Sequence, residues 1–313
     1  LPKHPKIEGQ ASQFRECIMP HHPDAVVVSL DFDSQELRVI ADYSQDENMV
    51  ACYVGDHKKD MHALTGHQIA VKKKMVEVTL SYEEFAKAAK TEDHPLHKVC
   101  KTYRALGKKV NFTTEFGAMA PKLAVTMLVT EQEAQTYIDA KEAMFPGVRR
   151  WKDSVIEASK RDGIVRTKGG AVRHLADAYM SDDHWIRSKA ERQSVNFEVQ
   201  SSSAEMTKRA EGRMWKKGLT FAYDCVYYGP IHDECVFSVM KVDLLRFLEE
   251  AHWCMTQPYA DMTIPIESSI SFGPSFGLQI EIGTKPTAEA VAKGFEQMEK
   301  AIAKAKAERA ANA

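Results

Sequence analysis

The chain has 313 residues, 44% of them hydrophobic, enough to bury a core as one large domain or two smaller ones. Its formal net charge of -2 does not by itself indicate a nucleic-acid-binding protein, so only a local basic patch could do so. No segment approaches the roughly 18 apolar residues of a membrane span, which argues against a membrane partner. The 6 cysteines show no CxxC spacing, which favours reduced thiols in the cytoplasm over disulfides or a zinc site.

The first regular element that the sequence predicts is a buried strand. Ala25-Val-Val-Val-Ser-Leu30 is a short β-branched apolar run of the kind found in strands that are covered on both faces. It leads into the acidic turn Asp31-Phe-Asp-Ser-Gln-Glu36, after which Leu37, Ile40 and Ala41 begin a helical spacing. The local prediction is therefore strand, acidic turn, helix.

The middle of the chain is predicted to be helical. Ser81 is a candidate N-cap and Glu84 completes a capping box for a helix over residues 82–90. Pro146-Gly147 provides a normal stop signal for a later helix. The further helical patterns cover residues 98–116, 131–144, 151–162 and 186–217.

After these helices the pattern changes to short strands. Cys225-Val-Tyr-Tyr228 and Cys235-Val-Phe-Ser-Val239 lie on either side of Gly229-Pro-Ile-His-Asp-Glu234, which predicts a hairpin whose turn carries acids. A closing strand is predicted over residues 263–270, and Pro265 favours an edge position for it. Between the hairpin and this strand, residues 243–256 are predicted to be helical.

The end of the chain, residues 284–313, is predicted to be an amphipathic helix. It is rich in Ala, Lys and Glu, and four apolar side chains recur at helical spacing. Val291, Phe295, Met298 and Ile302 fall on one helical face. Packing against the rest of the chain explains such a face more simply than binding to a partner.

Asp31 and Asp233 lie in acidic turns that are far apart in the sequence. Phosphoryl transfer with two metal ions needs carboxylates held on rigid elements, because two hard cations activate the attacking oxygen and stabilise the leaving one. Taken alone, each residue is better explained as an ordinary turn aspartate, since Asp is common in turns for local hydrogen-bonding reasons.

A third pattern changes this interpretation. Arg104, Lys108, Phe112 and Phe116 are spaced by four, so they lie along one face of a single helix. Such a face could grip a triphosphate through its two cations and stack a base on its aromatic rings. In isolation, a solvated charged face with two core aromatics remains an alternative explanation.

Together these segments resemble a known family. Val28-Ser-Leu-Asp-Phe-Asp-Ser-Gln-Glu-Leu-Arg38 closely matches motif A of bacterial DNA polymerase I-like enzymes. The helix face from Arg104 to Phe116 matches motif B, and Ile231-His-Asp-Glu-Cys-Val-Phe237 matches motif C, in the same order and at compatible spacings. Arg192, Asn196 and Gln200 resemble the family's helix that contacts template and primer. The chain therefore resembles the family A DNA polymerases over roughly residues 1–283.

The resemblance implies an α+β fold, with a right-hand polymerase palm built on an antiparallel sheet and with helical fingers. It places a first palm part with motif A at residues 1–58 and the fingers at 59–190, with the motif B helix at about 98–117. A second palm part with motif C follows at 191–283, before the C-terminal helix. The thumb and the exonuclease domain of relatives have no counterpart in this sequence, so we expect the catalytic piece of a split or truncated polymerase, with a companion chain that supplies the thumb.

The resemblance also implies an activity, which is template-directed DNA synthesis from dNTPs on a primer-template. Asp31 and Asp233 would ligate two Mg²⁺ ions together with the Phe32 carbonyl, and Glu234 would support this site as a catalytic residue. Glu36 would be the steric gate against a ribose 2′-hydroxyl. The implied dNTP-binding residues are Arg104, Lys108, Phe112, His62, Glu36 and Gln35, and those for primer and template are Arg192, Asn196, Gln200, His232 and Phe116.

Several positions depart from the family pattern. Phe116 stands where relatives usually have Tyr, Thr113 where they have Gly, and Pro230 where they have Gln. Because these positions contact or neighbour substrate, they bear on fidelity and processivity and not on metal chemistry. The segment between His62 and Arg104 is longer than in bacterial enzymes, which suggests a fingers insertion of phage type, a viral source and a location in the host cytoplasm.

Two other functions are consistent with parts of the sequence. A single-subunit RNA polymerase shares the two aspartates and the basic fingers helix, but Glu36 and Glu234 argue against it. A non-catalytic fragment that only binds DNA in a replication complex is the second alternative. Such a fragment would have no need of Asp31, Asp233, Arg104 and Lys108 together.

Overall fold

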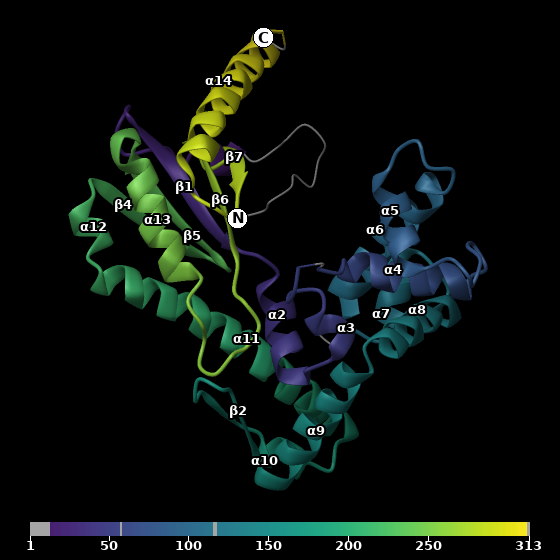
Figure 1. The fold of residues 1–313 in the computed structure, drawn as a ribbon. Coiled ribbons are helices and arrows are strands. Elements are labelled where there is room, and N and C mark those ends of the chain that lie inside the picture. Colours follow the sequence, from purple (N-terminus) through teal and green to yellow (C-terminus); the bar gives the residue numbers. More distant parts are fainter. Residues whose placement is uncertain (1–12, 57, 115–117, 312–313) are drawn as a thin grey trace. The chain divides into compact units, whose positions relative to one another are not determined.

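A computed structural model describes residues 13–56, 58–114 and 118–311 of the chain (Figure 1). The chain forms two compact units. Unit 1 comprises Leu1–Gln35, Ser203–Asp261 and Pro265–Ala313, and unit 2 comprises Glu36–Ser202 and Met262–Ile264. Each unit therefore draws on segments that are distant in the sequence.

Unit 1 is built on a five-stranded antiparallel sheet with the strand order β4-β5-β1-β6-β7. The central strand β1 consists almost entirely of buried residues, and the side chains of Val27, Val28 and Leu30 are 0% exposed. The sheet confirms the predicted α+β class with an antiparallel sheet. Its strands are β1 (Ala25–Phe32), β4 (Cys225–Ile231), β5 (Glu234–Met240), β6 (Ser268–Ser275) and β7 (Leu278–Gly283).

Helices cover this sheet within unit 1. α13 (Leu244–Met255) packs against β1, β5 and β6 and buries Phe247 completely. α14 (Ala288–Ala311) begins beside β7, where the ring of Phe295 lies 4.9 Å from that of Phe272 (Figure 1). The smaller elements of unit 1 are α1 (Gln13–Glu16), α12 (Leu219–Ala222) and the 3-10 turn η1 (Lys241–Asp243).

Unit 2 is helical apart from a small two-stranded sheet, β2 (Ile164–Arg166) and β3 (Val172–His174). One of its apolar clusters joins α4, α5 and α6 through fully buried side chains that include Ile69, Phe85 and Val110. Helices α2 and α11 cross the boundary between the units. The helices are α2 (Gln35–Ser44), α3 (Glu47–Val50), α4 (Met61–Lys72), α5 (Tyr82–Lys90), α6 (His97–Thr114), α7 (Ala120–Met127), α8 (Glu131–Met144), α9 (Pro146–Asp162), α10 (Ala176–Tyr179) and α11 (His184–Lys216).

Local sequence signals predicted most of the longer helices, but they did not predict α4 or α7, and α9 begins at Pro146 instead of at residue 151. The capping box forms as expected, with the Glu84 N–H donating to Ser81 Oγ at 3.2 Å and the Ser81 N–H donating to Glu84 Oε2 at 3.1 Å. The motif B helix runs over His97–Thr114, and the predicted site residue Phe116 lies outside the described residues. The terminal helix starts at Ala288.

Two strand predictions were wrong in detail. β4 continues through a bulge near Gly229 as far as Ile231, so the hairpin turn is only His232-Asp233 and not residues 229–234. The closing strand is β6, which starts at Ser268 and lies between β1 and β7 instead of at an edge. Residues 263 and 264 do not join the sheet because their backbone N–H groups donate to the carboxylate of Asp42.

All 6 cysteines lie in the described part of the chain, and none of them forms a disulfide there. No helix among the described residues combines the length and the hydrophobicity that a membrane span requires.

Candidate active-site residues in the two units

Three acidic residues from distant parts of the sequence meet in unit 1. Asp31, near the end of β1, pairs directly with Glu234 at the start of β5. The N–H of Phe32 also donates to the carbonyl oxygen of Asp233 at 3.2 Å. His232, the first residue of the two-residue turn, has a φ of 61°, a left-handed conformation that non-glycine residues seldom adopt. The tight turn therefore brings Asp233 and Glu234 to the same end of the sheet as Asp31.

The acids at this sheet end suit a hard cation. Like charges directly opposite each other on paired strands are unfavourable, yet Asp31 faces Glu234. Glu234 is only 6% exposed, and its Oε2 accepts no hydrogen bond from any described residue. Burial raises the pKa of the neighbouring Cys235 against the lowering effect of its hydrogen bond with Tyr227, and with the added effect of the negative charges of Glu211, Glu234 and Asp31 the pKa reaches about 12.

Carboxylate oxygens are the ligands that Mg²⁺ prefers in proteins, so these residues fit a divalent cation chemically. Among the described residues, however, no three His, Cys, Asp or Glu side chains are already grouped as ligands for one metal ion. The described residues thus provide the carboxylates without a closed set of three ligands.

A second group of predicted site residues meets in unit 2, around Asp60. This residue is the N-cap of α4, and its Oδ1 accepts from the N–H groups of His62 and Ala63 at 3.0 Å each. Its Oδ2 accepts from Arg104 Nε on α6 at 2.8 Å. Burial by itself raises the pKa of Asp60, but the hydrogen bonds from Ala63 and Arg104 outweigh burial and hold the pKa below its ordinary value.

His62 joins this group with a pKa below its ordinary value. Burial lowers its pKa, and the charges of Arg104 and Lys108 lower it further against the opposing effect of Asp60. The His62 ring lies 5.6 Å from the ring of Phe112, and Lys108 Nζ lies 5.9 Å from the centre of the same ring. The structure therefore brings together four residues that the sequence predicted to bind the dNTP.

Two glycines let α4 and α6 approach closely enough for this grouping. A Cβ added to Gly66 would lie 2.4 Å from the carbonyl oxygen of Tyr103, and one added to Gly107 would lie 2.4 Å from the carbonyl oxygen of His62. Both distances are too short for any side chain, so glycine is required at the crossing. The buried Asn111 completes it by donating to the carbonyl oxygen of Met61 at 3.4 Å.

The residues predicted for template and primer lie in the unit 2 part of α11. Arg192 and Gln200 are exposed, and Asn196 is half-buried. Arg192 and Asn196 help to line a pocket of about 430 Å³. Thr114 and Ala118 also line this pocket, and in the sequence these two residues flank residues 115–117, which lie outside the described part of the chain and include Phe116. The exposed His232 instead belongs to the hairpin turn of unit 1.

Two predicted nucleotide contacts lie at the start of α2. Glu36 is half-buried. Gln35 is 5% exposed, and its amide nitrogen donates to the Ser203 carbonyl oxygen at 3.1 Å and to Thr207 Oγ1 at 3.4 Å. Gln35 therefore already holds α2 to α11, in addition to the contact with a nucleotide that the sequence predicts.

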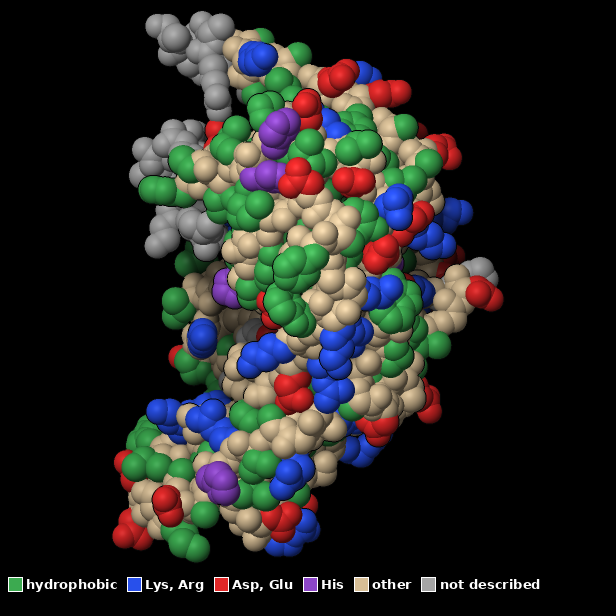
Figure 2. Space-filling view, turned by 90° about the vertical axis from the view of Figure 1, so that its left-hand side faces the viewer, with side chains coloured by type: hydrophobic (Ala, Val, Ile, Leu, Met, Phe, Trp, Pro, Cys, Tyr) green, Lys and Arg blue, Asp and Glu red, His purple; other side chains and the backbone are tan. Residues whose placement is uncertain are grey.

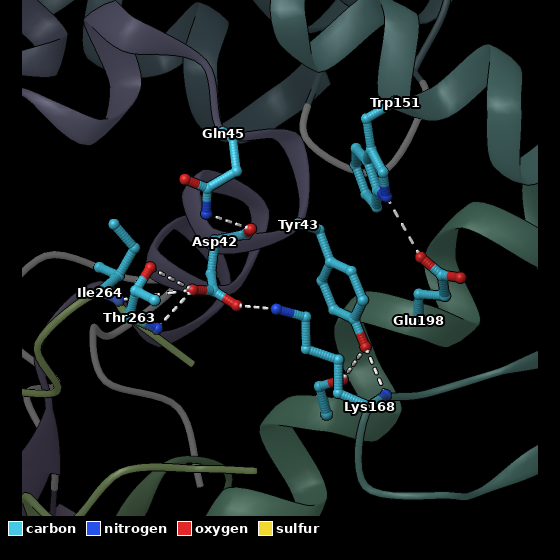
Figure 3. A network of polar contacts seen from close by, with 9 residues as sticks. Asp42, Tyr43, Gln45, Trp151, Lys168, Glu198, Thr263 and Ile264 are labelled. Carbon is cyan, nitrogen blue, oxygen red and sulfur yellow. Dashed lines mark hydrogen bonds and ion pairs between the residues drawn. The ribbon is translucent and has the colours of Figure 1, made fainter. Parts of the chain in front are cut away.

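A buried ion pair fixes α2 within unit 2 (Figure 3). The side chain of Asp42 is 2% exposed and its Oδ2 lies 2.5 Å from Lys168 Nζ. Its Oδ1 accepts from the Thr263 N–H at 2.7 Å, from the Thr263 hydroxyl at 3.1 Å and from the Ile264 N–H at 3.4 Å. One carboxylate thus connects three segments of the chain.

The same network reaches α9 and α11. The Tyr43 hydroxyl accepts from the Lys168 N–H at 2.9 Å and lies 3.0 Å from Ser202 Oγ. The Tyr43 ring stacks on Trp151, whose Nε1 donates to Glu198 at 3.2 Å. Burial raises the pKa of Glu198 to about 7, against the lowering effects of Trp151 and Lys168.

The outer surface of unit 1 carries aromatic and basic side chains close together. Figure 2 shows hydrophobic side chains gathered near the middle of one face, with Lys and Arg side chains around and below them. Trp215 and Phe221 are 68% and 76% exposed, and their ring centres lie 5.6 Å apart. Lys216 and Lys217 are also exposed at the end of α11. The chain therefore has local basic surface despite its overall net charge.

Sequence reasoning missed the residues that hold the predicted ones in place. Asp60, Asn111, Gly66 and Gly107 were not selected as site residues, although each lies in or next to the group around Arg104. The spacing of Gly66 and Gly107 on two separate helices has no signature in a single sequence. Asp60 could have been found, because an Asp immediately before a helix is a standard N-cap.

Comparisons with known proteins point to one family. The sequence model of the family described as DNA polymerase family A matches residues 3–90 and 84–278. DNA polymerase I of Geobacillus stearothermophilus is 25% identical over 267 residues, covering 85% of this chain and 28% of the relative. The thermostable DNA polymerase I of Thermus aquaticus is 26% identical over 248 residues, covering 79% of this chain and 26% of the relative. The chain spans about a quarter of the length of these relatives.

A solved structure has the same fold. The POL domain of Pol1 from M. smegmatis, in a complex with DNA primer-template and dNTP, matches with a TM-score of 0.68 and 20% sequence identity. The match covers 84% of this chain and 42% of that one. Because the family model covers most of the residues, including all three motifs, the chain belongs to DNA polymerase family A.

Proposed function

We propose that this chain catalyses template-directed DNA synthesis, in which the 3′-hydroxyl of a primer attacks the α-phosphate of a dNTP and pyrophosphate leaves. In this proposal unit 1 is the palm and unit 2 the fingers. The POL domain from M. smegmatis was solved in a complex with DNA primer-template and dNTP, and we propose the same two ligands for this chain. The companion chain, the viral source and the cytoplasmic location stay predictions.

The observation that carries the proposal is the pairing of Asp31 with Glu234, next to Asp233, at one end of the sheet. We propose Asp31 and Asp233, with the Phe32 carbonyl, as the ligands of two Mg²⁺ ions, and Glu234 as their support. When bound, these ions would lower the barrier by stabilising charge on the attacking and leaving oxygens. The rigid β1–β5 pairing would hold the carboxylates at fixed positions without ordering a loop.

The residues of unit 2 would bind and orient the nucleotide. Arg104 and Lys108 would hold the triphosphate, since Arg offers a planar fork of donors and Lys a compact charge. His62, whose pKa burial holds below its ordinary value, would donate a hydrogen bond beside these two cations. The exposed ring of Phe112 would pack on the sugar and base. Glu36 would exclude the ribose 2′-hydroxyl.

Primer extension tests the proposal. The 313-residue chain would be supplied with a primed template, Mg²⁺ and dNTPs, alone and with a companion chain that carries the thumb. We expect extension in at least one arm and its loss in Asp233→Asn, with DNA binding and melting temperature unchanged. Asp224→Asn is a matched control, because Asp224 is exposed and precedes β4 at the end opposite the hairpin turn.

Each alternative function has a distinct outcome in this experiment. Tight DNA binding without extension in any arm would contradict the proposal and favour a non-catalytic DNA-binding fragment. Extension with ribonucleotides in preference to dNTPs would favour an RNA polymerase. Extension by the Asp233→Asn variant at the rate of the unchanged chain would remove Asp233 from the active site.

A further inference from the structure

The segment between α4 and α6 carries a helix, α5, that has no part in the site as proposed above. Its first residue is Tyr82, which is half-buried. The Tyr82 hydroxyl accepts a hydrogen bond from the backbone N–H of Asp60 at 2.7 Å. A side chain from the longer inserted segment therefore contacts the residue that holds Arg104.

Asp60 transmits this contact to Arg104. Its carboxylate is fixed by the first turn of α4 on one oxygen and binds Arg104 Nε with the other at 2.8 Å. The Asp60 side chain is 16% exposed and the Arg104 side chain 36%. Within the described part of the chain, the two terminal nitrogens of the Arg104 guanidinium have no hydrogen-bond partner. We call the chain of contacts from the Tyr82 hydroxyl through Asp60 to Arg104 Nε the Tyr82–Asp60–Arg104 tether. Because it uses only Nε of Arg104, the two terminal nitrogens can donate to another ligand.

Tyr82 is itself held firmly. The capping box of Ser81 and Glu84 fixes the first turn of α5. One turn further on, Phe85 is fully buried and its ring lies 5.2 Å from that of His67 on α4. His67 is fixed in turn by a contact of 2.8 Å between its Nε2 and the Leu80 carbonyl oxygen. The hydroxyl of Tyr82 therefore has a defined position relative to the start of α4.

We propose that Tyr82 is a positioning residue for nucleotide binding, which acts through Asp60 to aim the planar donor fork of Arg104 at the triphosphate of the incoming nucleotide. A guanidinium held at Nε can rotate little about its side chain, so its two terminal nitrogens meet phosphate oxygens with less loss of conformational entropy. This inference rests on the proposed function, because it assigns a triphosphate to Arg104. It gives the inserted segment a role at the nucleotide-binding residues.

The first test is a kinetic double-mutant cycle. Tyr82→Phe removes only the hydroxyl, and we expect roughly a fivefold higher KM for dNTP, the effect of losing one ordinary hydrogen bond, with kcat nearly unchanged. Asp60→Asn, which keeps an N-cap but loses the charge, should raise the same KM. In an Arg104→Ala background, Tyr82→Phe should change kcat/KM no further. Tyr103→Phe is the matched control, because it removes a hydroxyl from the residue that precedes Arg104 on α6, and no described residue is a hydrogen-bond partner of that hydroxyl.

The second test does not depend on polymerase activity. In the chain labelled with ¹⁵N-arginine, the Nε–H of Arg104 should exchange slowly with solvent and faster by severalfold in Tyr82→Phe, but not in Tyr103→Phe. The Nε–H signal of Arg104 is identified as the one that disappears from the spectrum of the Arg104→Lys variant. If the unchanged chain fails to extend primers yet shows this protection, the proposed function fails while the tether stands. Unaltered KM and exchange in Tyr82→Phe, or an equal effect in the Arg104→Ala background, would overturn the inference.

Discussion

Replacing Asp42 with Ala is expected to destabilise unit 2 severely. The carboxylate is almost completely buried and receives three hydrogen bonds from Thr263 and Ile264 as well as the Lys168 ammonium. Alanine offers no acceptor, so two backbone N–H groups and one hydroxyl lose this partner at once. The Lys168 side chain, which is 24% exposed, also loses its counter-ion.

The magnitude follows from the burial of these groups. Removing one partner of a buried ion pair costs about 3–5 kcal/mol, because the other charge stays in place without compensation. A buried donor left without an acceptor costs about 1–3 kcal/mol. Partial exposure of Lys168 lets water replace part of the lost interaction, so we expect the free energy of unfolding to fall by about 4 kcal/mol and not by the full sum.

Urea denaturation followed by tryptophan fluorescence measures this change. Trp151 stacks on Tyr43 within the same network, so its emission reports on unit 2. The matched variant Lys168→Met removes the other partner, and the double variant should be less destabilised than the sum of the two. An Asp42→Ala chain within about 1 kcal/mol of the unchanged chain would refute the conclusion that this carboxylate holds the segments together.

Three further variants test other parts of the structure. Gly66→Ala should lower the free energy of unfolding by about 3 kcal/mol and raise the KM for dNTP, because the added methyl group would overlap the Tyr103 carbonyl. An unchanged melting curve would contradict the close crossing of α4 and α6. Burial raises the pKa of Glu198 from 4.5 to about 7, so between these pH values the folded chain holds a proton that the unfolded chain has released. The free energy of unfolding should therefore fall by up to about 3 kcal/mol as the pH rises from 4.5 to 7, and it should level off above pH 7. Glu198→Gln should remove that slope in urea titrations across this range, and a slope that persists would assign it to another group. Glu36→Ala should raise ribonucleotide incorporation relative to dNTP in single-turnover assays, and an unaltered ratio would reject Glu36 as the gate.

Elements with a strong local signal were predictable from the sequence. The β-branched run before Asp31 forms β1, and the Thr130 cap and Pro146 bound α8 at Glu131–Met144. Such signals act within a few residues, because a cap or a proline satisfies or removes hydrogen bonds of the adjacent turn. Hence the bounds of the predicted helices agree with the structure to within a few residues, except that α9 begins at Pro146 and not at residue 151.

The strand predictions after residue 228 failed where the outcome depended on pairing and hydrogen-bond partners outside the segment itself. Pro230 belongs to β4 because Cys235 of β5 pairs with it. Residues 263 and 264 leave the sheet because Asp42, more than 200 residues earlier in the sequence, binds their N–H groups. Strand pairing and buried carboxylates join residues that sequence periodicity treats separately.

The sequence by itself determined the local elements, the three motifs and the residue types of the proposed chemistry, because these depend on neighbours along the chain. Only the tertiary structure decided how they are held. The pairing of Asp31 with Glu234, the close crossing at Gly66 and Gly107, and the Tyr82–Asp60–Arg104 tether all join separate elements. Each depends on the distance between backbones after packing, and no single segment of sequence contains that distance.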